Sequence, residues 1–290
     1  MSDFVTLYEM GPRDGLQNEP DLIATQDKIA LVDRLSACGL KHIEVTSFVS
    51  PKWVPQMADA AQVLAAISRK PGVVYAALTP NIRGFENALA AGADEVAVFA
   101  SASEGFSHAN INCSIVQSIE RFTPIMDAAR DAGVRVRGYV SCVTDCPYDG
   151  AVSPSVVADV AAKLMALGCY QVSLGDTIGA ATPQTTTEML TAVLNQVAAQ
   201  NLAGHFHDTQ GHAIDNIAVA LDMGLRDFDA AVGGLGGCPY APGAQGNVAT
   251  ERVVEFLQAR GFETGIDREA LNVAAIFAKE LRKRMQILKH

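Results

Sequence analysis

Short apolar segments alternate along the chain with longer stretches of helical periodicity. The apolar segments that predict strands lie at residues 5–10, 42–48, 73–78, 95–100, 134–140, 170–175, 203–207 and 228–232. In the first stretch between them, "TQDKIALVDRLSACG", Ile29, Val32 and Leu35 fall on one face of a helix, and Thr25 stands in the N-cap position. The pattern therefore predicts strands and helices in alternation, beginning near the N-terminus.

A glycine ends each of five predicted helices. Gly39, Gly92, Gly133, Gly168 and Gly224 each follow a helical stretch and precede an apolar segment, as in "ACGLKHIEV" and "ALGCYQVSL". Glycine adopts the left-handed conformation of a helix C-cap at little cost because it has no Cβ. These glycines therefore mark the helix-to-strand turns of a recurring unit.

Eight strands that alternate with helices are typical of a (β/α)8 barrel. We expect residues 1–290 to form a single α/β domain of this kind, a TIM barrel with extra C-terminal helices in "TERVVEFLQARG" and "DREALNVAAIFAKELRKRMQIL". A doubly wound sheet is the alternative, but no G-x-G-x-x-G motif follows the first strand. In such a barrel, the active site lies where the strands end and the following loops begin.

The chain is acidic, with a formal net charge of −10 over 290 residues. This charge disfavours nucleic acid and anionic membrane surfaces as partners, and no apolar run is long enough to predict a membrane span. Six scattered cysteines without a disulfide framework, and no signal-peptide pattern, predict a cytoplasmic protein with reduced thiols. The sequence is compatible with a homodimer but does not specify an oligomeric state.

The stretch "GHFHDTQGH", residues 204–212, places His205 and His207 two positions apart on a predicted strand. A strand has a period of two residues, so both imidazoles project from the same face. A single buried histidine is more often held by a backbone carbonyl than by a metal. A pair at this spacing, followed at once by Asp208, favours a metal site.

Other polar residues stand at the ends of predicted strands, where a barrel would gather them. They are Arg13, Asp14 and Gln17 after the first strand, Glu44 on the second, Asp176 after the sixth, and Cys238 and Asn247 after the eighth. Structural alternatives stay open, because Glu44 could pair with an arginine inside the protein, and Asp176 and Asn247 could cap helices.

Asp14, His205, His207 and Asn247 together offer two oxygens and two imidazole nitrogens, with no thiolate. Such a mixed set suits a six-coordinate divalent cation, Mg²⁺ or Mn²⁺, better than it suits a closed structural zinc site. Positions left open on the cation would bind a chelating substrate, on whose oxygens the cation would act as a Lewis acid.

Six segments of the chain carry a resemblance to a known family. They are "GPRDGLQNE", "IEVTSFVSPKWVPQM", "RGYVSCVTDCPYDG", "SLGDTIGAATP", "HFHDTQG" and "GGLGGCPYAPGAQGNVATE". From about Val5 to beyond Glu251, the chain resembles the 3-hydroxy-3-methylglutaryl-CoA (HMG-CoA) lyase family of the metal-dependent (β/α)8 lyase and Claisen-condensing superfamily. The resemblance implies an acyl-CoA substrate, and retro-Claisen cleavage of (S)-HMG-CoA to acetyl-CoA and acetoacetate, as in leucine degradation.

The resemblance also implies roles for individual residues. The ligands of Mg²⁺ or Mn²⁺ would be Asp14, His205, His207 and Asn247. The catalytic residues would be Arg13, Glu44, Asp176, His205 and Cys238. Substrate would bind at Arg13, Gln17, Ser47, Arg137, Tyr139, Lys52 and Asn110. Lys52 and Asn110 would contact the CoA moiety, although their role as solvated loop residues stays open. Pro242 departs from the family pattern in the loop that contains Cys238.

Three rival interpretations remain. A condensing enzyme of the 2-isopropylmalate synthase kind usually carries a long C-terminal regulatory region, whereas only a short stretch follows Asn247 here. A lyase for a larger 3-hydroxy-3-alkylglutaryl-CoA fits the same motifs, because one pocket side chain changes chain-length selectivity by only ~1–3 kcal/mol. A non-enzymatic metal- or phosphate-binding barrel would leave Cys238 and Asp176 without roles.

A thiol in a glycine-rich loop after the last strand is suited to proton donation. Attack of Cys238 on a thioester would require an acyl-enzyme, which retro-Claisen cleavage does not need. We therefore expect Cys238→Ser to bind metal and HMG-CoA nearly normally but to turn over at least ~100-fold more slowly in a steady-state assay. Thiol reagents should inactivate the wild type unless substrate is bound. Near-normal turnover of the variant, or a trapped acyl-cysteine, would contradict this role.

Overall fold

The computed structural model describes the backbone of residues 4–238 and 241–287, and the side chains of residues 4–236 and 246–282. Eight parallel strands close into a barrel in the order β1-β10-β9-β8-β5-β4-β3-β2. Their bounds are β1 Thr6–Glu9, β2 His42–Ser47, β3 Val74–Leu78, β4 Glu95–Ser101, β5 Arg135–Ser141, β8 Gln171–Asp176, β9 Leu202–Phe206 and β10 Asp227–Ala230. The predicted (β/α)8 barrel and its eight strands are confirmed.

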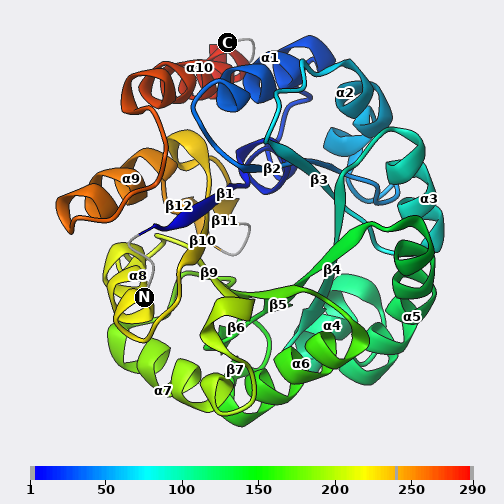
Figure 1. Ribbon diagram of the computed structural model, residues 1–290, viewed down its shortest axis with the longest axis vertical. Coiled ribbons are helices and arrows are strands. Elements are labelled where there is room, and N and C mark those ends of the chain that lie inside the picture. Colours follow the sequence, from blue (N-terminus) through cyan, green and yellow to red (C-terminus); the bar gives the residue numbers. More distant parts are fainter. Residues whose placement is uncertain (1–3, 239–240, 288–290) are drawn as a thin grey trace.

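Helices form a ring around the barrel (Figure 1). They are α1 Thr25–Ser36, α2 Ala60–Ala66, α3 Ile82–Ala90, α4 Glu104–Ile111, α5 Ile115–Ala132, α6 Pro154–Leu167, α7 Pro183–Leu194, α8 Ala213–Asp222, α9 Thr250–Ala259 and α10 Arg268–Ile287. The last two are the extra C-terminal helices, and α10 packs beside α1. Within the described ranges, no helix has the length and apolarity needed to cross a membrane.

Shorter elements occupy the connections. A single π-helical turn, η1 Gly11–Gly15, follows β1, and 3-10 turns lie at η2 Pro55–Met57, η3 Ala199–Asn201 and η4 Val232–Gly234. Two antiparallel hairpins pair β6 Asp145–Cys146 with β7 Gly150–Ala151, and β11 Gly237–Cys238 with β12 Ala241–Gln245. The second hairpin contains the predicted catalytic cysteine.

Local packing agrees with the sequence pattern except at one helix end. Ile29, Val32 and Leu35 of α1 are buried in the core, as their spacing predicts. The five helix-ending glycines all have positive φ, from 67° at Gly133 to 116° at Gly168. The prediction of Thr25 as an N-cap is wrong. Ala24 is the N-cap residue, and the hydroxyl of Thr25 donates instead to Asp59 Oδ2 at 2.8 Å, which ties α1 to the start of α2.

A buried carboxylate, Glu9 at the end of β1, joins three parts of the barrel mouth. Its Oε1 accepts the backbone N–H groups of Gly11 and Val232, both at 2.8 Å, and its Oε2 accepts the hydroxyl of Thr250 at 2.7 Å. The turn η1, the turn η4 and the start of α9 are thereby held together. Burial raises the pKa of Glu9 to about 7, against the lowering effect of these hydrogen bonds.

The raised pKa of Glu9 makes the stability of the fold depend on pH. A carboxyl whose pKa is higher in the folded state stabilises the protein below its unfolded value of 4.5, and this stability is lost as the pH rises through about 7. The loss is on the order of 3 kcal/mol. We therefore expect the free energy of unfolding of Glu9→Gln, relative to wild type, to rise by about that amount between pH 4.5 and pH 8 in urea titrations.

The exposed Glu120 on α5 offers a matched control for this measurement. Glu120→Gln removes a carboxylate without changing a buried group, so its unfolding free energy should follow that of wild type across the same pH range. If the unfolding free energies of Glu9→Gln and wild type differ by the same amount at every pH, the pKa of Glu9 does not change on folding.

Candidate metal centre and active site

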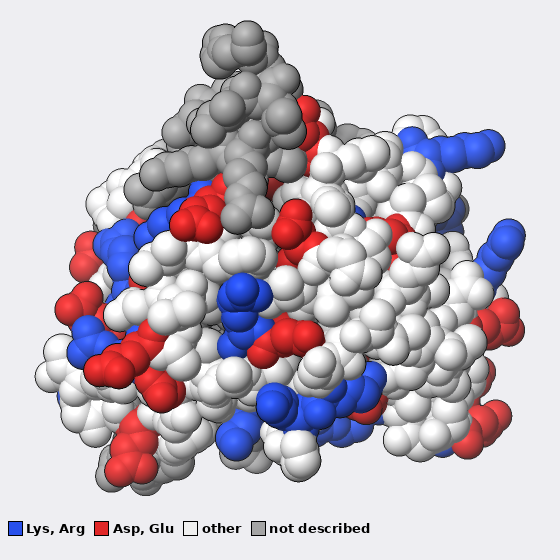
Figure 2. Space-filling model, turned by 90° about the horizontal axis from the view of Figure 1, so that it is seen from above, with Lys and Arg blue, Asp and Glu red and all other residues white. Residues whose placement is uncertain are grey.

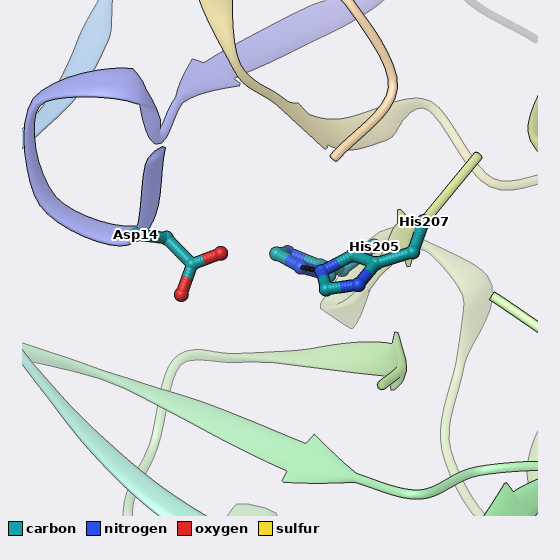
Figure 3. A group of neighbouring side chains, drawn as sticks. All are labelled: Asp14, His205 and His207. Carbon is teal, nitrogen blue, oxygen red and sulfur yellow. Dashed lines mark hydrogen bonds between the residues drawn. The ribbon is translucent and has the colours of Figure 1, made fainter. Parts of the chain in front are cut away.

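Two histidines and an aspartate meet at the mouth of the barrel. His205 lies on β9, His207 directly follows it, and Asp14 lies in η1 after β1. Figure 3 shows the Asp14 carboxylate directed toward the two imidazole rings. The Nε2 atoms of His205 and His207 are 3.2 Å apart, and one ligand atom from each of the three residues lies within 4.8 Å of the others.

Asn247 completes this group from the segment before α9. Its Nδ2 donates to Asp14 Oδ2 at 2.8 Å and to the carbonyl oxygen of Leu235 at 3.3 Å, which leaves its amide oxygen as the acceptor. An isolated antiparallel bridge pairs Asn247 with His207. The capping alternative for Asn247 is wrong, because Ala249 is the N-cap residue of α9.

The protonation states of these side chains suit a divalent cation. Burial alone would raise the pKa of Asp14, but the charges of Arg13 and the two histidines outweigh it and hold the pKa well below its usual range. Burial, together with His205, lowers the pKa of His207 to about 4. At neutral pH the aspartate is anionic and His207 is neutral, which are the forms that bind metal. The Nε2 atoms of His205 and His207 are within hydrogen-bond distance of each other, and both could serve as ligands if a divalent cation were bound.

Arg13 bridges the candidate metal ligand Asp14 and Glu44 of β2. Its Nε donates to Glu44 Oε2 at 2.7 Å, and its Nη1 donates to Asp14 Oδ1 at 2.6 Å. Arg13 and Glu44 are buried, and burial raises the pKa of Glu44 even though Arg13 opposes the shift. The arginine pairing that the sequence left open for Glu44 is present, and it fixes a guanidinium next to the metal ligands.

A second buried arginine, Arg137 on β5, is held from several sides. Its Nε donates to Gln171 Oε1 at 2.9 Å, and its Nη1 donates to the hydroxyl of Tyr139 at 3.2 Å. Its guanidinium carbon lies 3.9 Å from the ring centroid of Tyr8, and its Nη2 forms a 2.8 Å ion pair with Asp229 Oδ1. Arg137 and Tyr139, both predicted to bind substrate, are thus in contact with each other.

Asp229 is a site residue that the sequence analysis missed. It lies on β10 directly opposite His205 in the strand register, and its Oδ2 is 3.1 Å from His205 Nδ1. The signal available in the sequence was an acidic residue at the second position of the apolar segment 228–232. A carboxylate inside a barrel strand is buried and needs a hydrogen-bond or ion-pair partner, so such a position indicates a candidate site residue.

Asp176 ends β8 with its side chain buried. Its oxygens accept the backbone N–H groups of Ala180 at 3.1 Å and Ala181 at 3.2 Å. The capping alternative is wrong, because Thr182 is the N-cap residue of α7. Burial raises the pKa of Asp176 to about 6, although the two backbone hydrogen bonds lower it.

The remaining predicted substrate residues differ in their exposure. Gln17 Oε1 and Ser47 Oγ are buried atoms that have no hydrogen-bond partner among the described residues. Lys52 and Asn110 are exposed, so both the CoA contact and the solvated-loop alternative stay open for them. The backbone of Cys238 lies in β11, but its side chain lies outside the described residues. On the face in Figure 2, basic and acidic side chains are interspersed rather than gathered into one basic patch.

Known proteins share this sequence and fold over nearly their whole length. A family profile described as HMGL-like matches residues 5–277. The 3-hydroxy-3-isohexenylglutaryl-CoA/hydroxymethylglutaryl-CoA lyase of Pseudomonas aeruginosa is 60% identical over 92% of this chain and 89% of its own. The crystal structure of the HMG-CoA lyase from Brucella melitensis is 60% identical, with a TM-score of 0.96 over 97% of this chain and 99% of its own.

A second similar structure contains ligands. The HMG-CoA lyase from Acinetobacter baumannii, in complex with coenzyme A and 3-methylmalate, is 37% identical, with a TM-score of 0.92 over 98% of this chain and 92% of its own. The profile and these relatives cover almost the entire barrel, including η1, the end of β9 and the segment before α9, which supply the candidate metal ligands. The chain belongs to the HMGL-like family and, within it, to the hydroxymethylglutaryl-CoA lyases, which are carbon–carbon lyases.

Proposed function

We propose that the protein catalyses the divalent-metal-dependent cleavage of (S)-3-hydroxy-3-methylglutaryl-CoA to acetyl-CoA and acetoacetate. The observation that carries the proposal is the convergence of Asp14, His205 and His207 on one point, with the Arg13 guanidinium fixed beside it. A metal-ligand set that adjoins a buried cation is suited to a substrate whose oxygens become more negative as a carbon–carbon bond breaks.

The cation is Mg²⁺ or Mn²⁺, held by Asp14, His205, His207 and Asn247. The carboxylate of Asp14 and the amide oxygen of Asn247 are donors that Mg²⁺ and Mn²⁺ prefer, and the set contains no thiolate that would favour a softer metal. When bound, the cation supplies Lewis-acid polarisation of the hydroxyl and carboxylate oxygens of the substrate. The hydrogen bond from Asn247 Nδ2 to Asp14 Oδ2 holds these two ligands in a fixed relation.

Asp176 has the properties of the base that removes the C3 hydroxyl proton. Its pKa of about 6 leaves it mostly ionised at neutral pH, and close enough to the working pH for proton transfer. Glu44 is less suited to this step, because it is the buried ion-pair partner of Arg13, and its protonation would leave that guanidinium with less counter-charge. As the proton leaves, the C2–C3 bond breaks, the C3–O bond becomes the ketone of acetoacetate, and the electron pair stays on the acetyl unit as an enolate.

Arg13 and Cys238 act on the acetyl unit. The guanidinium, held by Glu44 and Asp14, stabilises the negative charge that develops on the thioester oxygen. Cys238, on the hairpin β11–β12 after η4, then donates a proton to the enolate carbon, which gives acetyl-CoA. Gln17, Ser47, Arg137 and Tyr139 bind the acyl portion. Lys52 and Asn110, on exposed segments, bind the CoA moiety, in keeping with the coenzyme A in the Acinetobacter baumannii structure.

A lyase that also accepts a larger 3-alkyl group is the second candidate. One observation is compatible with it: a groove of about 530 Å³ between α2 and α3 reaches Ser47, Phe48 and Met57 near the end of β2 and is otherwise lined largely by alanines. Its volume is sufficient for a branched hydrocarbon chain. The relative from Pseudomonas aeruginosa is named for an isohexenyl as well as a methyl substrate.

The test is an assay of purified, metal-replete protein with HMG-CoA and with 3-hydroxy-3-isohexenylglutaryl-CoA, each followed by detection of acetyl-CoA. We expect acetyl-CoA and acetoacetate from HMG-CoA, loss of activity in a chelator, and recovery with Mg²⁺ or Mn²⁺. A higher kcat/KM for the isohexenyl substrate would select the second candidate. Full activity of metal-free protein, or no cleavage of either thioester, would overturn the proposal.

Two substitutions separate metal binding from turnover. His207→Ala removes a proposed ligand, so we expect it to lose both Mn²⁺ binding and activity. Arg13→Met removes a neighbouring guanidinium but leaves the four proposed ligands, so the variant should still bind Mn²⁺. Its kcat should decrease by roughly 100-fold or more. Equilibrium dialysis with Mn²⁺ measures metal binding. Loss of metal from Arg13→Met alone would contradict the assigned ligand set.

A further inference from the structure

Asp229 makes three contacts, each with a residue of a different strand. Its Oδ2 lies 3.1 Å from His205 Nδ1 on β9 and accepts the Ser173 hydroxyl of β8 at 2.7 Å. Its Oδ1 forms the 2.8 Å ion pair with Arg137 Nη2 of β5. The side chain of Asp229 is fully buried, and that of Arg137 is 1% exposed. A carboxylate in this position is therefore fixed on both of its oxygens.

The contact with His205 determines where the imidazole carries its proton. The 2.8 Å ion pair with Arg137 and the hydrogen bond donated by the Ser173 hydroxyl identify Asp229 as a carboxylate, which can only accept hydrogen bonds. The facing atom, His205 Nδ1, must then be the donor. A neutral imidazole that is protonated on Nδ1 has its lone pair on Nε2. That Nε2 is the atom directed at His207 Nε2.

We propose that Asp229 is a positioning residue that holds His205 as the Nδ1–H tautomer, with Nε2 turned toward the metal, and that Arg137 and Ser173 hold Asp229 in place. The inference rests on the proposed metal-ligand set. Carboxylates that accept the second N–H of a ligating histidine orient the ring and increase its basicity. Here the carboxylate of Asp229 also neutralises the charge of Arg137. One side chain therefore links Arg137, a proposed substrate-binding residue, to His205, a proposed metal ligand.

A consequence concerns proton transfer. With Nδ1 bonded to Asp229 and Nε2 on the cation, both nitrogens of His205 are occupied. His205 can carry a proton during turnover only if one of these two bonds breaks. The two oxygens of Asp176 each accept one backbone N–H group within the described residues and keep further lone pairs that can take up a proton.

The experiment measures Mn²⁺ binding to metal-free protein, with free Mn²⁺ followed by electron paramagnetic resonance. Asp229→Asn keeps the volume of the side chain but removes the charge that selects the tautomer. We expect its Kd for Mn²⁺ to increase about 10–100-fold. Ser173→Ala keeps the charge and removes one hydrogen bond to it, so a smaller increase of about 3-fold is expected.

Glu95 provides a matched control in the same barrel. It is also a buried carboxylate, at the start of β4, and it pairs with Arg135 and Tyr170 rather than with a proposed ligand. Glu95→Gln therefore removes one buried negative charge that is not in contact with any of the proposed ligands. Its Mn²⁺ affinity should stay within about 2-fold of wild type, whatever its effect on stability.

A double-mutant cycle tests whether Asp229 acts through His205. In the His205→Ala background, Asp229→Asn should weaken Mn²⁺ binding by less than about 2-fold, because the group that it positions is gone. An equal loss in both backgrounds would overturn the inference and indicate a general effect of the carboxylate charge. Wild-type affinity in Asp229→Asn would overturn it as well. If Asp229→Asn does not fold, wild-type affinity in Ser173→Ala is the overturning result.

The same titrations separate this inference from the proposed function. If His207→Ala binds Mn²⁺ as tightly as wild type does, the proposed ligand set is wrong. Binding that is lost in His207→Ala but retained in Asp229→Asn would leave the ligand set in place and remove only the role of Asp229.

Discussion

Charges buried inside the barrel have to be neutralised by their neighbours, because the water that would otherwise solvate them is excluded. This constraint organises the whole mouth of the barrel. Arg13 lies between Glu44 and Asp14, and Arg137 is paired with Asp229. Removing one partner of such a pair leaves an uncompensated charge, which is strongly unfavourable. Each side chain is therefore confined to the position where its partner can reach it.

The pairing also sets the chemical states that a lyase of this family needs. Arg13 keeps Asp14 anionic, while burial beside His205 keeps His207 neutral. Asp176 has no arginine partner within the described part of the chain, and burial raises its pKa to about 6. Carboxylates at one barrel mouth thus differ in proton affinity because Asp14 is next to a guanidinium, whereas Asp176 is buried without one. That difference distinguishes a metal ligand from a base.

Glu9 connects the chain segments at the mouth of the barrel through hydrogen bonds. It connects η1, which carries Arg13 and Asp14, to η4, which leads to the hairpin of Cys238. Its third hydrogen bond fixes Thr250 at the start of α9, three residues after Asn247. The chain segments that carry the proposed ligands and the proposed proton donor are far apart in sequence. The hydrogen bonds of Glu9 are among the contacts that hold these segments together at the mouth of the barrel.

The sequence alone determined the class of the fold and the types of residue at its mouth. Hydrophobic periodicity and helix-ending glycines are local signals, so the eight strands and the positive φ angles at residues such as Gly39 and Gly168 could be predicted. The motif around His205 and His207 likewise identified the candidate ligands, because a strand places alternate residues on one face. Only the tertiary structure decided which charges pair. That Asp229 faces His205, and that Thr25 bonds Asp59 instead of capping its helix, depends on how the barrel closes and on the register between neighbouring elements. These contacts join residues distant along the chain, and no local pattern encodes the distance between them.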